Sequence, residues 1–160
     1  MEKVYIGKIV STHGIKGEIR ILSNFPFKEK VFKKGNNLII DDKNYIINSY
    51  RVHKNYDMVT FENYNNINDI LFLMKKDVYC EKNAIKLNDD EVLDEELIKY
   101  KVITTSNEIG YIKEIFEASK TNKILRIMLN REILVPLSSP MIKKIDKTKE
   151  EIIIELIDGM

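Results

Sequence analysis

Apolar and polar residues alternate with a period of two through most of the first half of the chain, which is the pattern of half-buried β-strands. Turn-forming residues, such as those at 41–44 and 54–57, interrupt this alternation at regular intervals. Short strands at such spacing are typical of a small barrel. The predicted strands are residues 4–10, 18–22, 37–40, 45–52, 58–61 and 77–81.

The segment 66–76 has a different period. Its apolar residues from Ile67 to Met74 recur three or four positions apart, and Asn66 stands where a helix cap is expected. This spacing predicts one short helix that leads into the last strand of the first barrel.

A polar connector near the midpoint, dense in Asn, Asp and Glu, breaks the strand rhythm. A second run of strands follows it, at residues 101–104, 110–116, 124–129, 133–136, 142–146 and 151–157. The sequence therefore predicts a mainly β protein with two small β-barrel domains joined by a short, partly helical linker. The expected boundaries are 1–83 for the first barrel, 84–97 for the linker and 98–160 for the second barrel.

The composition narrows the class of protein. Of 160 residues, 44% are hydrophobic and 32% charged, as in an ordinary folded chain. The apolar runs are much shorter than the roughly 18 residues that span a bilayer, and the start lacks a leader-like pattern, so we expect a cytoplasmic location and no membrane. The single cysteine, Cys80, excludes an internal disulfide and is expected to be a small buried residue. With only two histidines we expect no metal and no cofactor.

Charge is distributed unevenly along the chain. Residues 1–85 contain 14 Lys and Arg against 10 Asp and Glu, and the remainder contains 12 against 15. The first half is therefore basic and the second acidic, which weakly favours phosphate binding by the first half. Lysine outnumbers arginine 22 to 4, as in proteins of AT-rich genomes, so individual lysines say little about RNA.

The loop between the first two predicted strands contains the most suggestive group of residues. His13, Lys16 and Arg20 form a potential cationic surface for RNA phosphate, and Gly14 and Gly17 allow backbone amides to approach it. The alternative is a tight interstrand turn in which the glycines serve geometry alone. The two interpretations are compatible, and both stay open.

Enzymatic and metal-binding patterns are absent from the sequence. The glycine pair lacks the Gly-Lys-Ser/Thr ending of a phosphate-binding loop, and His13 has no recognisable nucleophile. The acidic residues at 89–96 lack the spacing of a calcium loop, and we interpret them as a solvated flank that can meet a basic partner protein. Near the end, Pro136 and Leu137 either present an apolar surface or terminate a barrel strand.

The segment from Ile6 to Ile19 resembles the start of the RimM family, in which a strand runs into His-Gly-apolar-basic-Gly-Glu. The resemblance continues through Arg51-Val52-His53-Lys54 and the apolar strand after it. In the second half, the segments at 109–112, 124–127 and 134–137 resemble that family's C-terminal PRC-type barrel.

This resemblance implies a non-enzymatic factor, expected to be monomeric, that assists late maturation of the head of the small ribosomal subunit. Its implied partners are the subunit precursor, the head ribosomal protein S-nineteen and nearby rRNA, with no small-molecule substrate. The residues expected to contact RNA or ribosome are His13, Gly14, Lys16, Gly17, Arg20, His53 and Lys54. Those expected to contact the ribosomal protein are Val92, Leu93, Leu97, Pro136 and Leu137.

The chain departs from the family pattern at several positions. Val92 and Leu93 replace a frequent tyrosine pair in the linker, and Asn63, Lys75 and Lys99 stand where glycines are common. The alternative function is a generic RNA-binding β-barrel protein without a ribosomal-protein partner, since the first half is basic.

Overall fold

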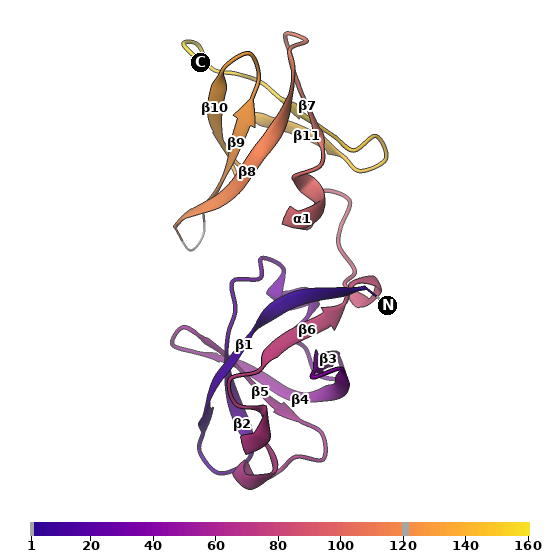
Figure 1. Ribbon diagram of the computed structural model, residues 1–160, viewed down its shortest axis with the longest axis vertical. Helices are drawn as coiled ribbons and strands as arrows, with labels where there is room; N and C mark the ends of the chain where they lie inside the picture. Colours follow the sequence, from indigo (N-terminus) through magenta and orange to yellow (C-terminus); the bar gives the residue numbers. More distant parts are fainter. Residues whose placement is uncertain (1, 120–121) are drawn as a thin grey trace. The chain divides into compact units, whose positions relative to one another are not determined.

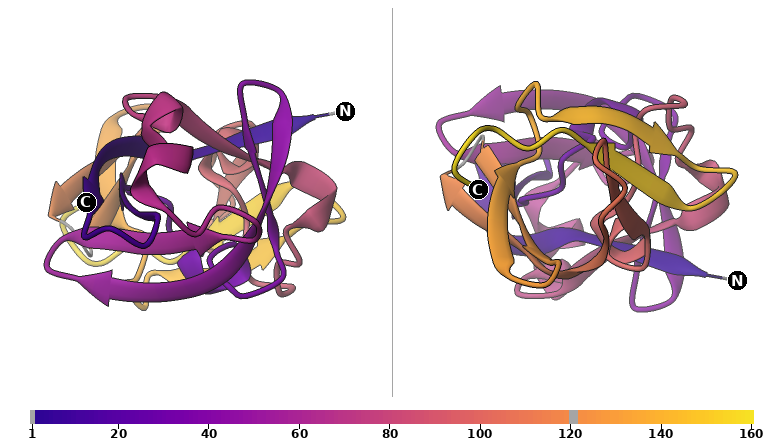
Figure 2. Two further views of the ribbon diagram at one scale, coloured as in Figure 1. Left: turned by 90° about the horizontal axis from the view of Figure 1, so that it is seen from below. Right: turned by 90° about the horizontal axis from the view of Figure 1, so that it is seen from above.

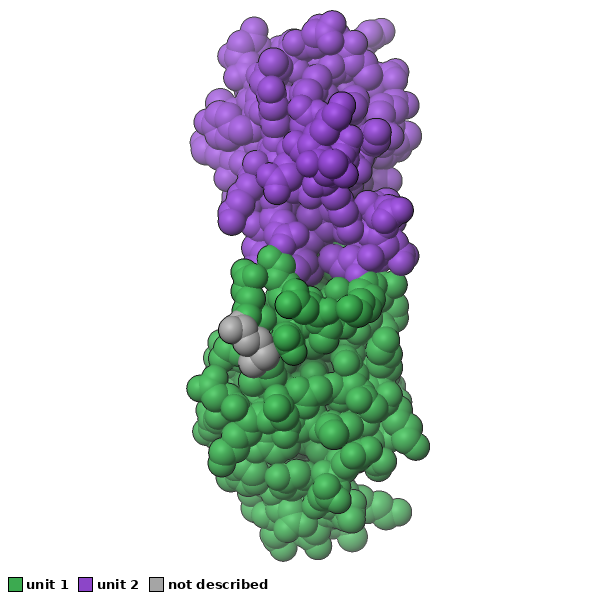
Figure 3. All heavy atoms as spheres, turned by 90° about the vertical axis from the view of Figure 1, so that its right-hand side faces the viewer, with its two compact units in different colours: residues 1–86 green, residues 87–160 purple. Residues whose placement is uncertain are grey.

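The computed structural model describes residues 2–119 and 122–160. It divides into two compact units, residues 1–86 and 87–160, which Figure 3 shows in different colours. The division lies inside the segment predicted as the linker. Each unit contains one six-stranded sheet, so the chain is mainly β, with a short helical segment between the two sheets. None of the described helices is long and apolar enough to cross a membrane.

Unit 1 is a closed barrel with the strand order β1-β2-β5-β4-β3-β6, whose strands form a ring in the left view of Figure 2. Its strands are β1 (Lys3–His13), β2 (Glu18–Leu22), β3 (Asn37–Ile40), β4 (Lys43–His53), β5 (Tyr56–Phe61) and β6 (Asp77–Glu81). Three single-turn 3-10 helices lie in the connections between them, η1 (Lys28–Lys30), η2 (Ile67–Asp69) and η3 (Leu71–Leu73), and a fourth, η4 (Lys82–Ala84), follows β6.

The prediction of one helix over 66–76 is wrong, because the segment forms the two separate turns η2 and η3. Asn66 caps the first turn as expected, and its side chain accepts a hydrogen bond from the backbone N–H of Asn68. The apolar spacing instead places Ile70 and Leu73 in the barrel interior. Lys75, at φ 68°, then leaves the helical region, and its N–H bonds Ile9 O on β1.

One end of the unit 1 interior contains a buried carboxylate. Asp57 on β5 is 1% exposed, and its Oδ1 accepts a 2.6 Å hydrogen bond from the Tyr50 hydroxyl on β4. Its Oδ2 forms an ion pair with Lys28 Nζ on η1 at 2.8 Å. The Tyr50 ring stacks on Phe32, with centroids 5.3 Å apart. These contacts fasten the β2–β3 connection, which contains η1, to the barrel.

Unit 2 has the strand order β10-β9-β8-β7-β12-β11, and Figure 1 labels each of these strands except β12. Its elements are α1 (Asp94–Leu97), β7 (Lys101–Thr104), β8 (Ile109–Ser119), β9 (Asn122–Met128), β10 (Glu132–Pro136), β11 (Ile142–Asp146) and β12 (Glu151–Ile154). All neighbours are antiparallel except β12 and β7, which are parallel. Val92 and Leu97 join the strand residues in the unit 2 core.

Candidate functional site

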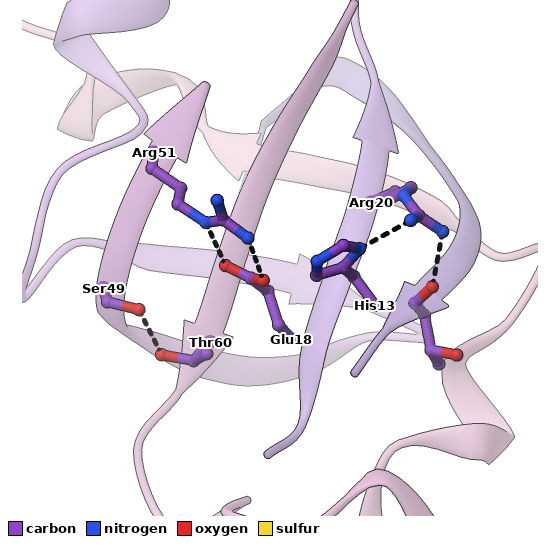
Figure 4. A network of polar contacts seen from close by, with 7 residues as sticks. His13, Glu18, Arg20, Ser49, Arg51 and Thr60 are labelled. Atoms are coloured by element: carbon purple, nitrogen blue, oxygen red, sulfur yellow. Dashed lines mark hydrogen bonds and ion pairs between the residues drawn. The ribbon is translucent and has the colours of Figure 1, made fainter. Parts of the chain in front are cut away.

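His13 and Arg20 lie on adjacent strands of the barrel, His13 at the end of β1 and Arg20 in the middle of β2. The register pairs Ser11 with Arg20, so the arginine reaches along β1 toward its carboxyl end. Arg20 Nη2 lies 2.6 Å from His13 Nδ1, and Nη1 donates to Thr12 O at 2.6 Å and to Ser11 Oγ at 3.1 Å (Figure 4). The guanidinium is thus held by its own barrel at three acceptors.

A second arginine lies on the same side of the sheet. Arg51 on β4 binds Glu18 on β2 in a bidentate pair, from Nε to Oε2 at 2.8 Å and from Nη2 to Oε1 at 2.7 Å (Figure 4). The hydrogen bonds from Arg51 lower the pKa of the Glu18 carboxyl, against the opposing effect of its partial burial. Glu18 is the strand partner of His13 across β1 and β2, so the carboxylate–arginine pair lies on the strand next to that histidine.

His53 lies beside His13, so the β4–β5 hairpin borders the same surface. Its ring centroid lies 5.5 Å from that of His13, with the planes tilted by 48°. Burial lowers the pKa of His53, and the charges of Arg51 and other nearby cations lower it further. Lys54 follows at φ 57°, a left-handed turn conformation, and is exposed.

The two glycines of the His13 loop, Gly14 and Gly17, differ in how much space surrounds them. Both have positive φ, 69° at Gly14 and 86° at Gly17, where L side chains are strained. A Cβ on Gly14 would meet nothing within 4 Å, whereas one on Gly17 would collide with the carbonyl oxygen of Tyr64. Gly17 therefore lets the loop pack against the segment before η2, and Ile67 N–H bonds Ile15 O at 2.9 Å.

The structure thus brings together most of the residues predicted for the first site, on three strands and two turns. His13, Arg20 and His53 are half-buried at its centre, and Lys16 and Lys54 are exposed at its edge. Sequence reasoning missed Glu18 and Arg51 as partners, since they are 33 positions apart and meet only through the β2-β5-β4 register. The described residues contain no group of three or more potential metal ligands. Such a surface is suited to hold an anion through noncovalent contacts.

Comparison with known proteins identifies the family. The model of the RimM N-terminal domain matches residues 4–85, which correspond closely to unit 1. The ribosome maturation factor RimM of Staphylococcus saprophyticus is 39% identical, with 99% of this chain and 98% of that protein covered. The chain belongs to the RimM family.

A second curated relative agrees with this assignment. The ribosome maturation factor RimM of Ligilactobacillus salivarius is 38% identical over 97% of this chain and 96% of its own. A crystal structure of a Pseudomonas aeruginosa protein, described as the 16S ribosomal RNA processing protein RimM, is 19% identical and covers 99% of this chain and 100% of its own, with a TM-score of 0.47. Membership of the RimM family places the chain among ribosome maturation factors and not among enzymes.

The residues that the RimM resemblance suggested for a protein partner lie in unit 2. Val92, Leu93 and Leu97 are 7%, 5% and 1% exposed, so these apolar side chains are buried and offer almost no surface. Pro136 ends β10 opposite Ile124, and Leu137 packs partly against the unit 2 core. Val92 and Leu93 stand where the family often has tyrosines. Unlike tyrosine, they have no hydroxyl group that needs a hydrogen-bond partner, so both can be buried completely.

Sequence reasoning missed the outward face of β8, β9 and β10. Tyr111 and Leu134 are 58% and 46% exposed there. Between the outer strands, Arg126 bonds Glu114 at 3.0 Å, lies 3.4 Å from Glu132, and stacks over the Phe116 ring at 5.3 Å. The alternation of positions within these strands could have revealed this face. Tyr111 and Leu134 alternate along their strands with Ile112, Ile133 and Val135, whose side chains are buried on the other face of the sheet.

Proposed function

We propose that the chain is a cytoplasmic assembly factor that binds the maturing head of the small ribosomal subunit, with unit 1 toward rRNA and unit 2 toward ribosomal protein S-nineteen. Its relatives in the RimM family are named ribosome maturation factors. The observation that carries the proposal is the cluster of His13, Arg20, Arg51 and His53, flanked by exposed lysines, on the basic unit.

The charge of the units supports this division of labour. Residues 1–86 contain 15 Lys and Arg against 10 Asp and Glu, and residues 87–160 contain 11 against 15. Phosphate contacts by Lys16 and Lys54 would release counterions and give unit 1 affinity for RNA. Gly14 is exposed, and a Cβ there would meet nothing within 4 Å, so this part of the loop can approach a phosphate closely.

Unit 2 has features of a protein-binding surface. On the outward face of β8, β9 and β10, Arg126 is paired with both Glu114 and Glu132. Exposed Tyr111 and Leu134 beside this ion-paired group resemble the mixture of aromatic anchors and polar surroundings found at interfaces. The acidic balance of unit 2 would also speed association with a basic ribosomal protein.

A retention assay on two kinds of particle tests the proposal. The tagged wild-type chain should retain immature small subunits and leave mature ones largely in the flow-through. The Lys16→Gln/Lys54→Gln variant should lose affinity for rRNA of the head, and Tyr111→Asp/Leu134→Asp should lose affinity for isolated S-nineteen. Lys43→Gln, at the far end of β4 from His53, is the matched charge control. Equal retention of mature particles, or of neither kind, would contradict the proposal.

The second candidate is a generic RNA-binding protein without a ribosomal-protein partner, which the basic unit 1 favours. This alternative predicts binding to head rRNA and to unrelated RNA with similar affinity and a steep loss with salt. It also predicts no complex with isolated S-nineteen in the absence of RNA. A stable protein complex without RNA would exclude it.

A further inference from the structure

The contact between Arg20 and His13 determines where the histidine proton lies. Arginine carries five N–H donors and has no acceptor, so in the 2.6 Å contact Arg20 Nη2 donates and His13 Nδ1 accepts. A ring nitrogen that accepts a hydrogen bond has no proton. His13 is therefore a neutral imidazole with its proton on Nε2, and this nitrogen is free to donate elsewhere.

The same geometry restricts what Arg20 itself can do. One guanidinium group donates to His13 Nδ1, Thr12 O and Ser11 Oγ, all within β1, and the side chain is half-buried. A phosphate that took these donors would break the contacts that hold the end of β1. Lys16 and Lys54 differ, since both are exposed and form no ion pair with the residues that the structure describes.

We propose that Arg20 is a positioning residue that fixes His13 as a neutral Nε2–H donor to a phosphate oxygen of RNA, and that Arg20 does not contact the phosphate. This inference rests on the proposed binding of rRNA by unit 1. It distinguishes two lysines that supply charge, Lys16 in the His13 loop and Lys54 in the β4–β5 turn, from a histidine that supplies one directed hydrogen bond. His53, 5.5 Å from His13 between ring centroids, borders the donor on the β4 side.

The proposal predicts the salt dependence of RNA binding. Each lysine or arginine that neutralises a phosphate contributes about 0.7 to 0.9 to the slope of log affinity against log salt. A neutral donor and its positioning residue contribute nothing to that slope. Loss of Arg20 should therefore weaken binding at every salt concentration without changing the slope, whereas loss of Lys16 or Lys54 should change the slope itself.

The first experiment observes the tautomer in the free, full-length protein. Long-range proton–nitrogen NMR spectra of the imidazoles should show His13 with a protonated Nε2 and a bare Nδ1 at neutral pH. In Arg20→Lys, the ammonium cannot reach all three acceptors, so His13 should become a mixture of tautomers. A protonated Nδ1 on His13 in the wild type would overturn the proposal whatever the RNA result.

The second experiment measures affinity for a transcript of the 16S rRNA head across a series of salt concentrations. Arg20→Lys and Arg20→Gln should both lower affinity about tenfold with the wild-type slope, and Lys16→Gln should lower the slope by about 0.7 to 0.9. A reduced slope in Arg20→Gln with an unchanged slope in Arg20→Lys would show that Arg20 binds phosphate directly, and would overturn the proposal alone. Failure of the wild type to bind the transcript would instead overturn the RNA part of the proposed function.

Two substitutions at His13 separate its two nitrogens. Asparagine places its amide near the Nδ1 position and can still accept from Arg20, but it does not reach the Nε2 position. Glutamine reaches the Nε2 position with an N–H donor. His13→Gln should therefore retain more RNA affinity than His13→Asn, with both proteins folded by NMR. Equal affinity of the two variants would count against a directed Nε2–H donor.

Discussion

The hydroxyl of Tyr50 donates a 2.6 Å hydrogen bond to Oδ1 of Asp57, and the carboxylate side chain is only 2% exposed. Burial and this bond raise the pKa of the Tyr50 phenol well above its usual value, so the group is protonated and acts as a donor at neutral pH. The buried carboxylate makes the barrel sensitive to the loss of a single oxygen atom.

Tyr50→Phe removes that donor and leaves Oδ1 buried with no partner from β4. A buried acceptor left without its hydrogen bond costs about 1–3 kcal/mol. We expect a loss of this size in the free energy of unfolding of unit 1, measured by urea denaturation followed through its amide NMR signals. Tyr5→Phe is the matched control, because the Tyr5 side chain is 53% exposed, and it should change stability by less than about 0.5 kcal/mol. Equal losses of unfolding free energy in Tyr50→Phe and Tyr5→Phe would show that the hydrogen bond from Tyr50 to Asp57 does not stabilise unit 1.

Alanine substitutions at the two loop glycines should differ in cost. Both positions have positive φ, so each alanine is strained by about 1–2 kcal/mol. Gly17→Ala additionally forces its Cβ into the Tyr64 carbonyl, and the loop must move. Thermal unfolding should show a clearly larger decrease in stability for Gly17→Ala than for Gly14→Ala. A reversed order would mean that the loop relaxes freely at Gly17.

Two positions where the RimM family often has glycine retain the backbone conformation of glycine. Asn63 has φ 69° and Lys75 has φ 68°. Lysine is strained in this region, whereas asparagine tolerates it. Lys75→Gly should stabilise unit 1 by up to about 1 kcal/mol, since the greater entropy of glycine in the unfolded chain offsets part of the relief. Asn63→Gly is the control and should be close to neutral; denaturation midpoints compare the two.

The Glu18–Arg51 pair predicts a pH dependence of stability. The folded state lowers the pKa of Glu18, so on acidification the unfolded chain takes up the proton first, near the ordinary value of 4.5. The stabilising contribution is complete above that value and disappears as pH falls through the lower folded pKa. The difference in unfolding free energy between wild type and Glu18→Gln should shrink from pH 6 to pH 3. Arg51→Gln should abolish that shrinkage, and an unchanged pH dependence in Arg51→Gln would contradict the assignment.

Much of the fold was predictable because turn residues and alternation agree. Strands β2, β3, β6, β7 and β11 have the predicted bounds. The strands β1, β4 and β8 extend further than the pattern indicated, and each contains a register shift where a bulge lets it pass from one neighbour to the next. Bulges depend on the partner strand, so a pattern read along one strand does not locate them.

The site was predictable only in part, for a similar reason. His13, Lys16 and Arg20 are close in sequence, so their proximity followed from the hairpin alone. The pairing of Arg51 with Glu18 depends on β5 lying between β2 and β4, which is a property of the barrel. Val92 and Leu97 show the converse difficulty, because an apolar residue in a connector has the same pattern whether it docks on a partner or packs in its own core.

The pairing of β1 with β6 joins the first strand of unit 1 to its last, with Lys3 opposite Glu81. During synthesis, β1 therefore lacks one of its two neighbours until β6, which ends at Glu81, has left the exit tunnel of the translating ribosome. His13 and the acceptors of Arg20 lie in the other part of β1, which pairs with β2. The ring therefore closes only after every residue of the anion-binding surface has been synthesised, and closure then secures the strand that bears His13.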